Sequence, residues 1–139
     1  MEWMFHCCFS LYTLNFLNLN LRNVKNMNSF CYQCHSLILT NFTNIRTLNV
    51  TNYGAMFDDC GSLTSLELAN FKTRNIDSMF KSCPNLRYID IQSINYHPLY
   101  DSSFRIIGYG LSNYGTIKIN SGCIITIQNT LSNWTIIIS

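Results

Sequence analysis

Residues 56–68 read MFDDCGSLTSLEL, and the spacing of the apolar positions in this stretch decides the fold. An apolar pair is followed after two residues by a cysteine, and three residues later by the first leucine of a Leu-x-x-Leu-x-Leu series. The same arrangement begins at Met4, Phe30 and Met79. The cysteines at its centre are 26, 26 and 23 residues apart, at positions 8, 34, 60 and 83. Several positions therefore recur together, which identifies an internal repeat.

A period of this length with a Leu-x-x-Leu-x-Leu core is typical of leucine-rich repeats. The sequence therefore predicts an α/β repeat fold. This fold is a short leucine-rich-repeat solenoid with a parallel β-sheet on its concave face and turns or short helices on its convex side. We expect strands near residues 12–16, 38–42, 64–68, 87–91 and 116–119. Stacked units share one core, to which the repeat cysteines would contribute as small apolar residues.

Two regions follow from the extent of the repeat. Residues 1–94 are predicted to form four coils with the period of 26, 26 and 23. Residues 95–139 are predicted to form a degenerate coil and a C-terminal cap, since Pro98, Gly108 and Gly110 interrupt the pattern.

The composition excludes several other classes of protein. The 139 residues are 47% hydrophobic but only 12% charged, with a net charge of +2. There are 18 asparagines but only two alanines and two glutamates, so a helical bundle is excluded. High hydrophobicity argues against a disordered chain, and the small charge argues against a nucleic-acid partner.

The chain shows no targeting or membrane signal by sequence. The first residues lack the basic start and continuous apolar region of a secretory signal. No stretch reaches the length of about 18 apolar residues that a membrane span needs.

The outward residues of the predicted strands form the candidate binding surface. Side chains alternate along a strand, so the residues between the core positions face the concave side. Solenoids commonly bind along such a surface. The predicted ligand-binding residues are Thr13, Asn15, Leu39, Asn41, Ser65, Glu67, Tyr88 and Asp90, and a further row holds Leu17, Thr43, Ala69 and Gln92. This mixed, mildly acidic surface favours a protein or glycan ligand over nucleic acid.

A metal or haem site is the alternative that the cysteines suggest. Cys31, Cys34 and His35 match the Cys-x-x-Cys-His haem-attachment pattern, and with His6 and Cys7 they offer zinc ligands. However, Cys34 is already explained by the repeat. We therefore predict no cofactor and no metal site, with mostly reduced thiols. The chain is also predicted not to be an enzyme, since no nucleophile, base and orienting group occur together in a recognisable pattern.

The repeat resembles a known family. The residues Met56, Phe57, Cys60, Ser62 and Leu63, followed by Thr64–Leu68 and Phe71–Ile76, are similar to the repeats of BspA-like leucine-rich-repeat surface proteins. The resemblance covers roughly residues 4–94. The end of the chain, from Gly115 to Thr135, is similar to the strand, short helix and Asn-Trp-Ser/Thr close of that family. Thr40 in place of a core leucine and Cys31 in place of a phenylalanine depart from it.

The resemblance implies a surface-exposed, non-catalytic binding or adhesion module. It implies a cell-surface or extracellular location, while the missing signal peptide leaves a cytoplasmic location open. A second hypothesis is that the chain is a fragment of a longer repeat protein without independent function, with further repeats N-terminal to it.

Overall fold

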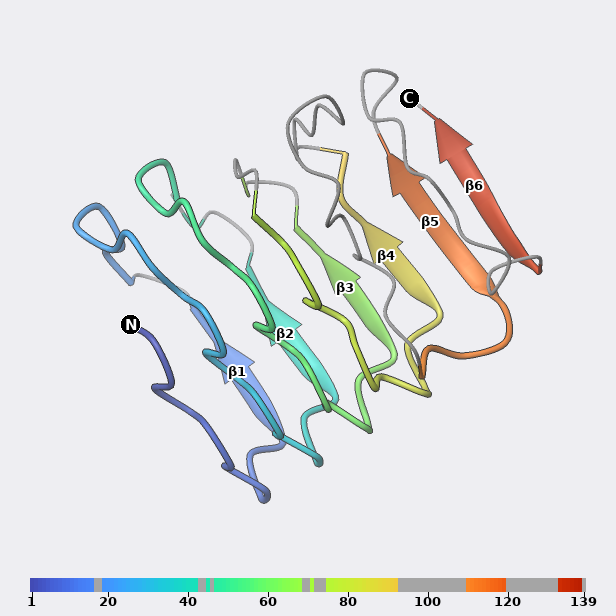
Figure 1. Cartoon of the computed structure of the whole chain (residues 1–139), viewed down its shortest axis with the longest axis horizontal. Coiled ribbons are helices and arrows are strands. Elements are labelled where there is room, and N and C mark those ends of the chain that lie inside the picture. The colour runs from blue at the N-terminus through green and yellow to red at the C-terminus, as the bar shows by residue number, and fades with distance from the viewer. Residues whose placement is uncertain are drawn as a thin grey trace.

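The computed structural model describes residues 1–16, 19–42, 45, 47–68, 71, 75–92, 110–119 and 133–138. It is a solenoid of parallel strands that lie side by side in chain order (Figure 1). The strands are β1 (Thr13–Asn15), β2 (Leu39–Asn41), β3 (Ser65–Glu67), β4 (Tyr88–Asp90), β5 (Gly115–Ile119) and β6 (Trp134–Ile138). β1 pairs with β2, and β3 to β6 pair in sequence as a four-stranded sheet.

The strand register repeats the spacing of the sequence. Leu14 pairs with Thr40, which is 26 residues later, and Leu66 pairs with Ile89, which is 23 residues later. Three residues have therefore been lost in the third coil. Asn52 lies ten positions after Phe42, whereas the equivalent Asn75 lies only seven positions after Leu68. The shortening thus lies between the end of a strand and the next turn, where it leaves the strand pairing unchanged.

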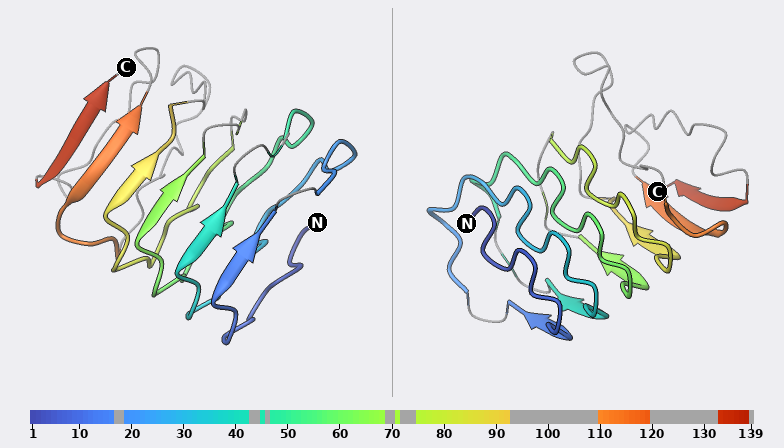
Figure 2. Two further views of the ribbon diagram at one scale, coloured as in Figure 1. Left: turned by 180° about the vertical axis from the view of Figure 1, so that it is seen from behind. Right: turned by 60° about the horizontal axis from the view of Figure 1, so that its bottom comes forward.

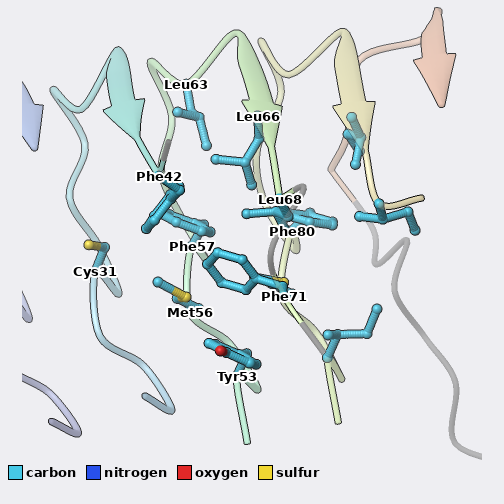
Figure 3. Packing of buried hydrophobic residues seen from close by; sticks show 14 of the residues in the cluster. Cys31, Phe42, Tyr53, Met56, Phe57, Leu63, Leu66, Leu68, Phe71 and Phe80 are labelled. Atoms are coloured by element: carbon cyan, nitrogen blue, oxygen red, sulfur yellow. The ribbon is translucent and has the colours of Figure 1, made fainter. Parts of the chain in front are cut away.

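The core runs through the solenoid as columns of equivalent residues. Met56, Phe57, Leu66, Leu68 and Phe71 are all buried, and Figure 3 shows them packed between the strands and the returning chain. Their neighbours on the strands, such as Ser65 and Glu67, are exposed. No unit encloses its own apolar side chains, so each coil depends on the next for burial.

The returning side of each coil forms a second hydrogen-bond ladder. The backbone N–H groups of Ser29, Cys31 and Gln33 donate to the carbonyls of Gly54, Met56 and Asp58, each at 2.9 Å. The first coil uses Trp3, Phe5 and Cys7 in the same way, and the third uses Ala55, Phe57 and Asp59. Figure 2 shows these returning segments stacked behind the strands. Both sides of a coil are therefore joined to its neighbour by main-chain bonds.

Two residues in each of the first four coils have a left-handed backbone conformation. One column contains Trp3, Ser29, Ala55 and Ser78, and the other contains Cys7, Gln33, Asp59 and Ser82, all with φ between 50° and 62°. None of these is a glycine, although this conformation is costly for residues with a Cβ atom. The positions bend the chain through consecutive tight turns, in which Phe30 N–H bonds Met27 O and Cys34 N–H bonds Cys31 O.

An asparagine opens the turn region of the second, third and fourth coils. The side-chain oxygens of Asn26, Asn52 and Asn75 accept from the backbone N–H two residues later, at 2.9, 2.9 and 3.2 Å. Asparagine forms this local turn readily. The three asparagines also stand in register across neighbouring coils, which accounts for part of the high asparagine content.

The predicted solenoid is confirmed, and all five predicted strands are found. Of the turns or short helices expected on the returning side, the described residues form turns. The two left-handed residues of a coil, which lie four positions apart, account for the turns because they interrupt any helical run. The sixth strand, β6, and its pairing with β5 were not predicted. The degenerate coil largely lies outside the described residues, as do residues 120–132, where the resemblance implies a short helix.

Candidate functional site on the outward face of the sheet

The eight predicted ligand-binding residues lie on one face of the strands. We call this the outward face. It consists of Thr13, Asn15, Leu39, Asn41, Ser65, Glu67, Tyr88 and Asp90. Pairing places Thr13 beside Leu39, Asn15 beside Asn41, Ser65 beside Tyr88, and Glu67 beside Asp90. All eight are exposed or half-buried. Leu17, Thr43 and Ala69 of the further row lie outside the described residues, while Gln92 is half-buried.

The part of the outward face on β1 and β2 carries no charge. Thr13 and Asn15 supply a hydroxyl and an amide, and Asn41 supplies a second amide beside that of Asn15. Leu39 is 58% exposed between these polar groups. This part can offer hydrogen-bond donors and acceptors around one apolar contact.

The part on β3 to β5 is charged. The Lys118 ammonium lies 4.0 Å from an Asp90 carboxylate oxygen and 5.4 Å from the centre of the Tyr88 ring. Hydrogen bonding and charge interaction with Tyr88, with a smaller contribution from Asp90 and Glu67, raise the pKa of Lys118. Gln92 N–H donates to Asp90 Oδ1 at 3.2 Å, which fixes that carboxylate. Tyr88, Asp90 and Lys118 therefore form one ordered cluster.

Lys118 is a member of this face that the sequence interpretation missed. It pairs in register with Asp90, and Thr116 pairs in the same way with Tyr88. The predicted strand at residues 116–119 already indicated this position. Side chains alternate along a strand, so Lys118, between the buried Ile117 and Ile119, faces outward. Because the sequence before β5 departs from the repeat spacing, the residue of β4 that pairs with Lys118 could not be predicted.

The fold buries the Cys31 and Cys34 side chains within hydrogen-bonding reach of each other but places His35 apart from them. The thiols of Cys31 and Cys34 are fully buried, and Cys34 Sγ donates to Phe5 O at 3.0 Å. The His35 ring is exposed instead, where it stacks on Phe9 and lies 3.2 Å from Asp59 Oδ2. Among the residues that the structure describes, no group of three potential metal ligands comes together. The six described cysteines are free thiols.

The repeat cysteines form a hydrogen-bonded column. Cys60 Sγ donates to Cys31 O at 3.2 Å and Cys83 Sγ donates to Phe57 O at 3.0 Å, just as Cys34 does to Phe5. Burial raises the pKa of Cys83 to about 12 and that of Cys60 further. A hydrogen bond with Cys34, together with burial, raises the pKa of Cys31. The same hydrogen bond lowers the pKa of Cys34. Cys60 and Cys83 are therefore neutral donors in the scaffold.

A buried carboxylate lies on the returning side. Asp58 is 6% exposed, and its Oδ2 atom is 3.6 Å from the Lys81 ammonium. Burial raises the Asp58 pKa, and Lys81 opposes that rise only in part. On the neighbouring column, Cys7 Sγ donates to Gln33 Oε1 and Gln33 Nε2 donates to Asp59 Oδ2, at 3.2 and 3.3 Å. These contacts link three successive coils.

Comparison with known proteins gives one match. A family model described as "Mycoplasma protein of unknown function, DUF285" matches residues 1–105. Neither the search of curated proteins nor that of solved structures found a match. The described residues contain no helix whose length and apolar character would allow it to span a membrane.

Proposed function

We propose that this chain, which belongs to the DUF285 family, is a non-catalytic binding module. In this proposal the outward face recognises a protein or glycan ligand, and the buried columns serve only as scaffold. The observation that carries it is the alternation along β3. Ser65 and Glu67 are exposed, while Leu66 between them is 1% exposed. The same alternation in the other coils aligns polar side chains into rows.

The chemistry of the rows supports a ligand bound by hydrogen bonds and shape. Amides and hydroxyls occupy the part on β1 and β2, and on β4 and β5 the Asp90 carboxylate lies 4.0 Å from the Lys118 ammonium. A strongly charged ligand would have to compete with the Asp90–Lys118 pair. A neutral polypeptide segment or a sugar with many hydroxyl groups would not.

The resemblance to BspA-like surface proteins adds adhesion as the biological setting of the proposal. In that setting the chain would act at the cell surface or outside the cell. The sequence shares with those proteins the residues of the scaffold, such as Met56, Phe57 and Cys60. The ligand would therefore be determined by the outward residues, which differ from coil to coil.

Glycan and protein arrays probed with the purified chain test the proposal. The double variant Ser65→Ala/Tyr88→Ala should lose most of the binding to any ligand that is found. The matched control is Thr51→Ala/Asp77→Ala, which alters two exposed residues away from the outward face and should bind like the parent chain. Equal loss in both variants, or none in either, would refute recognition by the outward face.

A further inference from the structure

The last strand of the sheet has one unpaired edge. β6 pairs with β5 over five residues, from Gly115–Trp134 to Ile119–Ile138. In the described part of the chain, no strand pairs with its other edge. Figure 1 shows β6 at the outer end of the row of strands. The N–H and C=O groups along this edge point away from β5, where another strand could bond them.

Core positions are exposed on β6, in contrast to β5. Ile117 and Ile119 are 0% and 5% exposed, but Ile136 and Ile138, which pair with them, are 43% and 65% exposed. Ile137, on the other face of β6, is 40% exposed. The apolar column that begins at Leu66 and Ile89 therefore reaches the surface at Ile136.

The sequence of β6 lacks the features that usually keep an edge strand from pairing with another chain. Natural edge strands avoid pairing by means of lysine, proline, bulges or short length. The residues from Trp134 to Ile138 include neither a charge nor a proline, and this strand is one of the two longest described. Two copies of such a strand would meet without repulsion.

We propose that the chain forms a dimer by antiparallel pairing of β6 with β6 of a second copy. Ile136 would then lie opposite Ile136 of the second copy, and Trp134 opposite Ile138. This register uses all five residues and places the Ile136 and Ile138 side chains of both copies on the same face of one continuous sheet. Parallel pairing of β6 with β1 of another copy would engage only the three residues of β1. A two-fold axis also closes the assembly at two chains.

Sedimentation equilibrium on the full chain tests the dimer. We expect a reversible monomer–dimer equilibrium that stops at two chains, with the modest affinity of a small interface. Ile136→Lys and Ile136→Glu should each weaken the dimer by about tenfold or more, because like charges then lie directly opposite each other. A mixture of the two variants should restore association, since lysine then faces glutamate.

The controls separate the proposed pairing from other kinds of association. Leu48→Lys makes a similar change at a side chain that is 67% exposed on another part of the chain, and it should dimerise normally. If Ile136→Lys does not fold, as judged by circular dichroism, Ile137→Lys places the charge on the outward face of the same strand. A monomer at all concentrations, growth beyond two chains, or a mixture that stays monomeric would overturn the proposal. The dimer does not depend on the proposed ligand-binding function.

Discussion

The Cys60 thiol donates a hydrogen bond of 3.2 Å to the main-chain carbonyl of Cys31 in the preceding coil. A thiolate could not donate this bond, so the scaffold requires the protonated form. Cys34 and Cys83 make the equivalent bonds. The conserved geometry from coil to coil explains why a cysteine, and not simply any small apolar residue, suits this position.

Stability should fall in alkaline solution because of these thiols. The ordinary thiol pKa is 9.0 and that of folded Cys83 is about 12, so between these values the unfolded chain loses protons that the folded chain keeps. The stabilisation is complete below pH 9 and declines above it, by about 1.4 kcal/mol per pH unit for each such thiol. Urea unfolding of the reduced protein between pH 7 and pH 10.5 measures the decline. Cys83→Ser keeps a hydrogen-bond donor that does not titrate in this range, so its free energy of unfolding should decline less with pH. Equal slopes for the two proteins would contradict this explanation.

Replacing Thr40 should stabilise the fold. Its Oγ1 atom is buried without a hydrogen-bond partner among the described residues, in a column where the next coils have Leu66 and Ile89. Thr40→Val removes the unpaired hydroxyl while keeping the shape, and should raise the free energy of unfolding by about 1 kcal/mol. Urea denaturation measures it, with Thr13→Val on the exposed side of β1 as the control. A fall in stability for Thr40→Val would show that the hydroxyl is satisfied in solution.

Substitution by alanine should cost far more stability at the inward positions of a strand than at its outward positions. Leu66→Ala leaves a cavity in the shared core and should cost about 2–5 kcal/mol, as should Ile89→Ala in the next coil. Glu67→Ala alters an exposed side chain and should change stability by less than about 0.5 kcal/mol. Thermal and urea denaturation of the three variants give the comparison. The reverse order would invert the assignment of the strand faces.

Replacing Ala55, which has a left-handed backbone conformation, with glycine should stabilise the fold. Ala55 has a φ of 50°, and the conformation costs a residue with a Cβ atom about 1–2 kcal/mol. Part of the gain from glycine is offset by its greater freedom in the unfolded chain, so Ala55→Gly should stabilise by up to about 1 kcal/mol. Ala55→Val should destabilise, because a branched Cβ tolerates this backbone least. Melting temperatures of the two variants check the opposite signs.

The scaffold was largely predictable because each coil repeats the same apolar positions. The strands around Leu14, Thr40, Leu66 and Ile89 follow from that spacing, as do the outward residues between them. The left-handed residues could not be foreseen, since tryptophan, cysteine, serine, alanine and glutamine carry no special signal for that conformation, and aspartate, which does, occurs at only one of the eight positions. Lys118 was missed because the sequence before β5 departs from the repeat spacing, and β6 was missed because it lies beyond the repeat.

The missing three residues between Leu68 and Asn75 have a practical consequence. Both the strand pairing of Leu66 with Ile89 and the alignment of Asn52 with Asn75 survive the shortening. The length of this connection is thus uncoupled from the stacking of the coils. Insertions or deletions in this connection should therefore be tolerated, provided that they keep the buried Phe71 in the core.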